Sequence, residues 1–302
     1  MDIIGKKYLY FAISLVVLIP GMISLVLYGL KPAIDFSGGS RIEYQVSGIK
    51  YQVSSDEIKK TIQSEGVDLG SIQKSGNNTF IVRTKPIDQK TNEKIKQALE
   101  QKYPGSKELS FATVGPTIGS ETTINAIKAV LVASILIVLY IAWSFRKVPK
   151  PASSWRFGVC AIVALLHDVL VVVGVFSLLG HFFNVEVDSL FVTAVLTVIG
   201  FSVHDTIVVF DRIRENLYRM GAGNFPHVVN ESILQTLGRS LNTSLTVILV
   251  LFTLLLFGGE SIRWFVVALL VGVASGTYSS IFNAAPLLVM WEEWSRKRKI
   301  KK

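Results

Sequence analysis

The chain has 302 residues, half of them apolar, and its mean hydropathy is positive. The apolar residues gather in runs of about twenty, the length that crosses roughly 30 Å of hydrocarbon, which excludes an ordinary water-soluble protein. The formal net charge is +9, but the basic residues gather at the ends of the apolar runs and in the tail. That distribution favours membrane orientation and contact with anionic lipid over binding of nucleic acid.

Six apolar runs predict six transmembrane helices, at about 8–29, 123–144, 157–180, 188–210, 240–258 and 264–291. The first run follows Lys6 and Lys7 and is longer than the core of a signal peptide. No small-x-small cleavage site follows it, so we expect it to be retained as a span.

The loops differ in their content of lysine and arginine. The basic loops are those between spans two and three (Arg146 to Arg156) and between spans four and five (Arg212 to Arg219), whereas 180–187 has no lysine or arginine. Because basic loops stay in the cytoplasm, both termini are predicted there. This divides the chain into 1–30 (N-terminus and first span), 31–122 (a domain outside the cytoplasm), 123–292 (spans two to six) and 293–302 (a basic cytoplasmic tail).

The outer segment has the pattern of a small α+β domain. Residues 41–46 alternate with period two, and two further strands at 69–74 and 79–84 flank a turn at 76–78. Ser54 and Glu57 predict a capping box at the start of a helix, with a hydrophobic staple between Val53 and Ile58. A second helix ends before Pro104-Gly105, and 109–113 alternate again. The order β-α-β-β-α-β is that of the ferredoxin-like fold.

Ionisable residues inside the predicted spans are the main functional signal, because they are costly in hydrocarbon. His167-Asp168 lies in span three and His204-Asp205 in span four. At about 1.5 Å per residue, Asp168 is roughly 18 Å from the last basic residue before its span, near the midplane, and Asp205 is roughly 10 Å from Arg212.

Arg239, at the start of span five, is the candidate partner of Asp205. It either pairs with that carboxylate or extends to the lipid headgroups. Burial favours the neutral form of a carboxyl group and a nearby arginine favours the charged form, so a carboxyl group under both influences suits proton carriage. Asp168 can equally bond a neighbouring helix, and each histidine can equally be a satisfied structural group.

Other patterns indicate packing or exclude chemistry. Gly272 and Gly276 form a Gly-x-x-x-Gly face in span six, and Ser240, Thr243 and Ser244 cluster in span five, for packing within the chain or against a partner. The sequence lacks the His-Glu-x-x-His and Gly-x-Ser-x-Gly motifs, and Gly38-Gly39 lacks the Gly-Lys-Ser/Thr ending of a phosphate loop. We therefore expect no enzyme activity and no cofactor besides protons. The single cysteine, Cys160, is too few for a cysteine metal site.

Several segments resemble the SecF family of protein-export membrane proteins, part of the SecD/SecF family and the resistance–nodulation–division superfamily. The segment Val198 to Asn216, with Gly-Phe-Ser-Val-His-Asp at its centre, is similar to the family's span-four signature. Matching segments are 34–39 (Ile-Asp-Phe-Ser-Gly-Gly), 114–121 (Val-Gly-Pro-Thr-Ile-Gly-Ser-Glu), 166–169 (Leu-His-Asp-Val) and 235–244 (Gln-Thr-Leu-Gly-Arg-Ser-Leu-Asn-Thr-Ser). They occur in order along most of the chain.

The resemblance implies a subunit that works with the homologous SecD beside the SecYEG channel. That pair uses the proton gradient to pull unfolded exported polypeptides across the bacterial cytoplasmic membrane after the motor SecA has acted. The family's span-four aspartate falls on Asp205 and its span-five arginine on Arg239. His204 departs from the pattern, which leads us to expect a neutral polar residue such as asparagine there.

Two alternatives remain open from the sequence. One is a non-transporting assembly subunit, in which the buried charges only hold SecD. The other is an exporter of small molecules or lipids from the same superfamily. Such exporters usually carry two large outer domains in one chain, and this chain has a single segment of about ninety residues.

Overall fold

The computed structural model describes residues 1–46, 54–75, 79–146, 153–221 and 223–300. The chain forms two compact units: a membrane unit, Met1–Lys31 with Lys128–Lys302, and an outer unit, Pro32–Ile127. The division falls within a single long helix, α5 (Pro116–Ser144). The predicted limits of 31–122 refer to the membrane surface and stay a prediction.

The prediction of six membrane-spanning helices is confirmed: in the part of the chain that the structure describes, six helical segments are long and apolar enough to cross a membrane. They are α1 (Lys7–Tyr28), α5, α6 (Ser154–Phe183), α7 (Ser189–Met220), α8 (Phe225–Phe257) and a segment that begins with α9 (Arg263–Ser279). The last span continues from α9 through a π-helical segment, η3 (Ser280–Ala284), into α10 (Ala285–Ile300). Short 3-10 turns precede α1 (η1, Ile4–Lys6) and α9 (η2, Glu260–Ile262).

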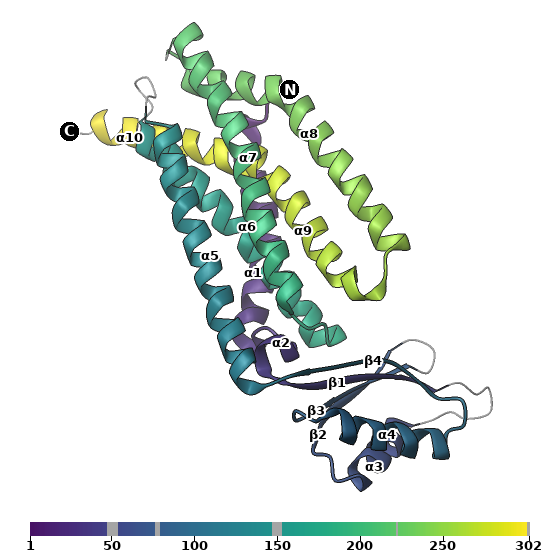
Figure 1. Ribbon diagram of the computed structural model, residues 1–302. Coiled ribbons are helices and arrows are strands. Elements are labelled where there is room, and N and C mark those ends of the chain that lie inside the picture. The colour runs from purple at the N-terminus through teal and green to yellow at the C-terminus, as the bar shows by residue number, and fades with distance from the viewer. Residues whose placement is uncertain (47–53, 76–78, 147–152, 222, 301–302) are drawn as a thin grey trace. The chain divides into compact units, whose positions relative to one another are not determined.

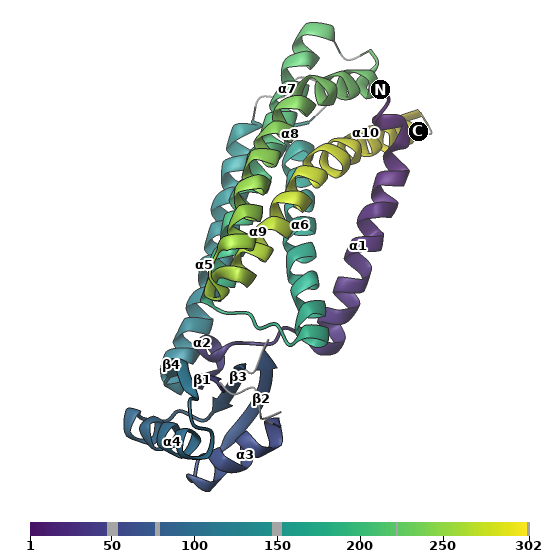
Figure 2. The same cartoon turned by 90° about the vertical axis from the view of Figure 1, so that its right-hand side faces the viewer.

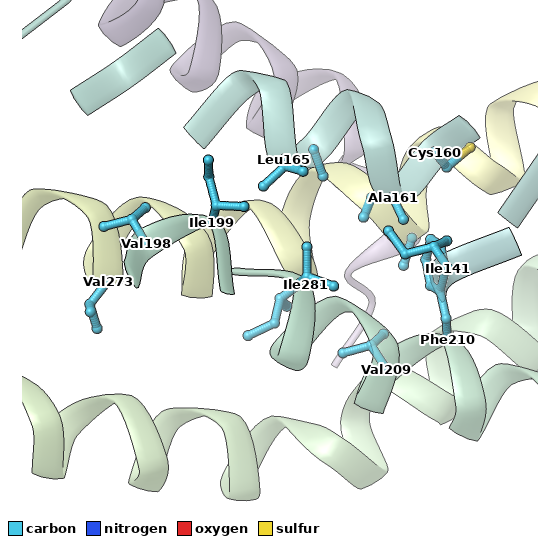
Figure 3. Packing of buried hydrophobic residues seen from close by; sticks show 14 of the residues in the cluster. Ile141, Cys160, Ala161, Leu165, Val198, Ile199, Val209, Phe210, Val273 and Ile281 are labelled. Carbon is cyan, nitrogen blue, oxygen red and sulfur yellow. The ribbon is translucent and has the colours of Figure 1, made fainter. Parts of the chain in front are cut away.

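Three of these helices, α6, α7 and α9, form the centre of the membrane unit (Figure 1). Leu165, Ile199 and Ile281, one from each of α6, α7 and η3, belong to the same buried apolar cluster (Figure 3). Helices α1, α5 and α8 are much less buried. Of these, α1 lies along α6 (Figure 2), where Gly21 and Gly174 meet so closely that a Cβ on Gly21 would lie 2.9 Å from the Cα of Gly174.

The predicted Gly-x-x-x-Gly face of the last span packs within the chain. A Cβ on Gly272 would overlap the side chain of Val198 on α7, and one on Gly276 would lie 3.1 Å from the Cβ of Ser202. The missing side chains therefore let α9 approach α7 closely. This brings the hydroxyl groups of α9 within reach of carboxyl groups on its neighbours.

The start of η1 and the end of α10 lie at the same end of the membrane unit (Figures 1 and 2). There, the Nζ of Lys7 on α1 lies 2.7 Å from an oxygen of Glu293 on α10, and Arg156 on α6 pairs with Glu292. An even number of spans returns the chain to the side on which it began. The structure thus agrees with the prediction that both termini lie on the same side of the membrane. The assignment of that side to the cytoplasm stays a prediction.

The outer unit has the predicted ferredoxin-like fold. Its elements are β1 (Gly39–Gln45), α3 (Ser55–Ser64), β2 (Leu69–Ser75), β3 (Thr79–Thr84), α4 (Gln89–Lys102) and β4 (Lys107–Val114). The strands form an antiparallel sheet in the order β2-β3-β1-β4. The inward residues of the strands, such as Ile42 and Phe80, pack with Ile58, Ile95 and other apolar residues of the two helices into a separate core.

The start of α3 differs in detail from the predicted capping box. The Ser54 hydroxyl accepts a hydrogen bond from the backbone N–H of Asp56, at 3.2 Å, and so caps the helix as predicted. The Glu57 carboxylate instead accepts from the hydroxyl of Tyr103, at 3.4 Å. A tertiary contact takes the place of the reciprocal bond, so this part of the prediction is wrong. Val53 of the predicted staple and the turn at 76–78 lie outside the described residues.

Gly38 and Gly39 join the short helical turn α2 (Ile34–Ser37) to β1. Their φ angles are +69° and +117°, in the region that favours glycine. A Cβ on Gly39 would lie 2.8 Å from the carbonyl oxygen of Thr84. The paired glycines therefore allow the chain to turn into β1 and to pass close to Thr84. This role agrees with the absence of the ending of a phosphate loop.

Candidate ion-coupling site

Asp168 is enclosed at the centre of the membrane unit, and its side chain has no exposed surface. The hydroxyl groups of Ser202 on α7 and Ser279 on α9 donate to its Oδ2, at 2.5 and 2.6 Å. Ser275 on α9 donates to Oδ1 at 2.7 Å, and the Nδ1 of His167 lies 3.0 Å from the same oxygen. Asp168 thus joins α6, α7 and α9.

These four contacts match the hydrogen-bonding capacity of a carboxylate, which offers about four lone-pair positions. Moving a charge without such partners from water into an apolar interior would cost roughly several kcal/mol of free energy or more. Between the two interpretations of Asp168 that the sequence left open, the geometry favours bonding to neighbouring helices. We name Asp168 with Ser202, Ser275 and Ser279 the serine cradle.

Asp205 is also buried, with 5% of its surface exposed, but it has far fewer partners. The hydroxyl of Ser240 on α8 donates to Oδ1, at 2.9 Å. The other carboxyl oxygen, Oδ2, is buried and accepts no hydrogen bond from any described residue. Most buried polar atoms are hydrogen-bonded, so Oδ2 stands out as an oxygen that can accept a further hydrogen bond or a proton.

Arg239 comes immediately before Ser240 on α8, and its residue is exposed. Among the described residues, no ion pair joins it to Asp205 or to any other carboxylate. The structure therefore brings Arg239 to the neighbourhood of Asp205, with Ser240 as the group in direct contact. Pairing between Asp205 and Arg239 stays a prediction.

The two histidines differ in their surroundings. His204 is exposed on α7, although it is adjacent to Asp205 in the chain. His167 has 13% of its side chain exposed, and its Nε2 is buried without a hydrogen-bond partner among the described residues. The five predicted residues thus separate into two groups, Asp168 with His167, and Asp205 with Arg239 beside it and His204 on the surface.

Sequence reasoning missed most of the serines that hold the two carboxyl groups. Further hydroxyl pairs continue between the same helices, from Thr206 to Ser280 at 3.0 Å and from Ser244 to Thr277 at 2.5 Å. The signal was the concentration of hydroxyl residues at 275–280 in the last span. Their spacing alone does not indicate that they face a carboxylate.

The outer unit holds titratable groups whose pKa values are shifted by burial. Burial, with the nearby Arg41, lowers the pKa of Arg83 to about 10, and burial raises the pKa of Tyr44. Neither shift brings its group near neutrality, so these groups keep their ordinary charge at pH 7. Within the described ranges of the chain, no three His, Cys, Asp or Glu side chains are grouped to hold a metal ion.

The fold and the site define a polytopic membrane protein with carboxyl groups buried between its spans and a ferredoxin-like domain after the first span. Residues 94–294 match the family model described as "Protein export membrane protein SecD/SecF, C-terminal", and residues 23–48 match the "SecD/SecF GG Motif". The chain therefore belongs to the SecD/SecF family.

Its curated relatives are subunits of protein translocases. The chain is 48% identical over 304 residues to the SecF subunit of Thermobaculum terrenum, with 97% of this chain and 94% of the relative covered. It is 37% identical to the SecDF subunit of Bacillus subtilis, with 96% of this chain and 38% of the relative covered.

Among solved structures, the chain is similar to SecDF from Thermus, described as a translocon-associated membrane protein. The TM-score is 0.83 at 33% identity, with 97% of this chain and 39% of that chain covered. The chain thus spans about two fifths of this neighbour. As a SecF-type chain of a protein translocase, it functions in protein export.

Proposed function

We propose that this chain couples the proton gradient to protein export, with Asp205 as the proton carrier. The observation that supports the proposal is the arrangement around Asp205, whose Oδ2 is buried without a partner among the described residues while Oδ1 is held by Ser240. A carboxyl group of this kind can take up a proton without breaking an existing bond. Arg239, near Asp205 on α8, favours the charged form when the proton leaves.

The proposed setting is the bacterial cytoplasmic membrane, with both termini in the cytoplasm. SecD is the proposed partner, because the similar SecDF proteins carry both names in one chain. The SecYEG channel, the motor SecA and the unfolded exported polypeptide are the further proposed partners, and lipid surrounds the spans. In this proposal the chain catalyses no reaction of its own and requires no cofactor beyond the protons.

The serine cradle has a different proposed role. Asp168 already has four hydrogen-bonding partners, so a change in its protonation would disturb contacts with three helices. We assign it to holding α6, α7 and α9 together. The alternative in which the buried charges only hold SecD stays open for Asp205 and is addressed by the test below. The similar translocase subunits give no support to an exporter of small molecules or lipids.

The test is the export of a secreted reporter in cells whose only copy carries Asp205→Asn. We expect the proton-dependent part of export to be lost, while the membrane level and the co-purification of SecD stay normal. Glu231→Gln, a carboxyl change elsewhere on α8, is the matched control and should export normally. Normal export by Asp205→Asn would sink the proposal, and loss of SecD from the purified complex would assign Asp205 to assembly instead.

A further inference from the structure

The last span changes its helical form between α9 and α10. The segment that joins them, η3 (Ser280–Ala284), is π-helical, so each of its backbone hydrogen bonds spans five residues instead of four. Pro286, the second residue of α10, explains this change. It has no backbone N–H to donate to the preceding turn, and its ring clashes with the carbonyl group four residues earlier. After η3 the chain continues in a different direction (Figures 1 and 2), and single π-helical turns of this kind are frequent at functional sites.

Hydroxyl groups compete with the backbone hydrogen bonds just before η3. The carbonyl oxygen of Gly276 accepts from the backbone N–H of Ser280 and also from its hydroxyl, at 2.6 Å. The hydroxyl of Ser279 donates to the same oxygen at 3.2 Å. Serine hydroxyls that bond back to the preceding turn often bend a helix. With Pro286 on the other side, η3 is the place where the last span can bend most easily.

On the α9 side of η3, the last span is fixed in the interior of the membrane unit. Ser275 and Ser279 belong to the serine cradle, which joins α9 to α6 and α7. The hydroxyl oxygen of Thr277 lies 2.5 Å from that of Ser244 on α8. Because these short contacts are made by small side chains in a close-packed core, α9 is held in one position.

On the α10 side, the last span is held by longer side chains. Lys7 of α1 pairs with Glu293, at 2.7 Å, and Arg156 of α6 pairs with Glu292. Lysine and arginine side chains are long and have many rotamers, so such pairs persist when a helix moves by a small distance. In this respect α10 can change its angle to α9 while its partners stay the same.

The last span also contacts the Asp205 site on both of the helices that form it. Thr206, the residue after Asp205 on α7, has its hydroxyl oxygen 3.0 Å from that of Ser280, the first residue of η3. On α8, Ser244 lies about one turn after Ser240 and bonds to the end of α9. A movement of α7 relative to α8 therefore reaches η3 directly.

We propose that η3 is the hinge of the membrane unit, at which α10 changes its angle to α9 when the helices around Asp205 move. The few residues of η3 absorb the change in backbone angles, as in other hinges, while the serine cradle keeps α9 in place. The inference rests on the proposed function of Asp205 and adds the element that moves with it.

The first test locks the hinge reversibly in the full chain, assembled in membranes with a SecD that lacks cysteine. Cys160 is the single cysteine of this chain, so Cys160→Ala gives a background without thiols. Ser14→Cys with Asn283→Cys joins α1 to η3, where the native side chains are 2.9 Å apart. Ser24→Cys with Ser177→Cys joins α1 to α6, where they are 2.8 Å apart, and is the matched control. A short bis-methanethiosulfonate closes each pair, and dithiothreitol reopens it.

We expect closure of the pair at 14 and 283 to stop proton-dependent export of a secreted reporter, and reopening to restore it. The control pair should permit export in both states. Export by the closed chain overturns the hinge, and so does an equal loss of export in the closed control. If Asp205→Asn blocks export while the closed chain exports, the hinge alone fails. If Asp205→Asn exports normally, the proposed function fails, and the cross-link is judged by itself.

The second test removes the cause of the hinge without any cross-link. Pro286→Ala supplies the missing N–H and a residue of high helix propensity, so the complex should be at least as stable to heat as the wild type. We expect export to slow several-fold nevertheless, which a purely structural role of Pro286 would not produce. Pro20→Ala, at the proline inside α1, is the matched control and should export normally. Export at the wild-type rate by Pro286→Ala overturns the hinge.

Discussion

At the scale of single residues, the two buried aspartates should respond differently to the same substitution. Asn at position 168 keeps one acceptor oxygen, but its NH₂ group is a donor and faces hydroxyl groups that donate to the carboxylate in the wild type. Each hydroxyl on that side must turn to accept or lose its hydrogen bond. Leaving buried donors unsatisfied costs about 1–3 kcal/mol, so Asp168→Asn should lower the thermal stability of the purified complex and its level in the membrane. Ser275→Ala removes one donor and should have a smaller effect.

The stability of Asp168→Asn is best compared with that of Asp205→Asn. Asp205 has one hydrogen-bonding partner among the residues that the structure describes, so its substitution should leave the unfolding temperature close to that of the wild type. If Asp168→Asn proved as stable as the wild type and failed only in export, the cradle would be part of the proton path rather than a structural junction.

A second residue-scale prediction concerns Asp88, which caps α4 in the outer unit by accepting from the backbone N–H of Thr91, at 3.0 Å. Hydrogen bonds from Thr91 lower the pKa of Asp88. The folded pKa lies below the unfolded value of about 4. The stabilisation is therefore complete above pH 4 or so, and is lost as the pH falls through the folded pKa.

Pepsin, which is active in acid, can measure this loss as faster cleavage within α4 of the full chain. Asp88→Asn keeps an oxygen that caps the helix but does not titrate. The wild type should lose resistance relative to this variant as the pH falls below about 4. If the resistance to pepsin changed with pH in the same way for the two proteins, the charge of Asp88 would contribute nothing to the stability of α4.

At the scale of elements, the contact between α7 and α9 depends on the missing side chain of Gly272. A Cβ there would overlap Val198, and overpacking of this kind costs typically about 1–3 kcal/mol. Gly272→Ala should therefore lower the unfolding temperature, and Val198→Ala in the same chain should restore part of it. Gly200→Ala, at a helical glycine of α7 with open space around it, is the control and should be neutral. An equal effect at both glycines would point to helix propensity instead of the contact.

The elements themselves could largely be predicted from the sequence, because their patterns are local. The six spans follow from apolar runs, and the strand predicted at 79–84, next to the turn at 76–78, has the same limits as β3. The serine cradle could not be predicted. Hydropathy indicates that a helix spans the membrane, but it does not indicate which face of that helix packs against which neighbouring helix. For the same reason, the sequence could not show that Ser240, and not its neighbour Arg239, makes the contact with Asp205. The close approach of Gly39 to Thr84 could not be predicted either, because it depends on how the strands pair in the fold.

At the scale of the whole molecule, the chain carries two apolar cores that share no residue, one in the membrane unit and one in the outer unit. We expect each to unfold by itself. Ile95 is 1% exposed in the outer core, and truncating a buried isoleucine to alanine costs about 2–5 kcal/mol. In hydrogen exchange of the full chain, Ile95→Ala should reduce the protection of α3, α4 and the sheet. It should leave the protection of α6, α7 and α9 unchanged, because their core keeps all of its contacts.

Leu109→Ala, at a half-exposed position of β4, is the matched control, and its effect on the same peptides should be small. A loss of protection in α6 and α7 after Ile95→Ala would mean that the two units unfold as one. Independent cores would instead allow the outer unit to change its conformation while the serine cradle keeps the membrane helices in place. The proposed function, which combines work on polypeptide on one side of a membrane with proton exchange inside the membrane, needs that separation.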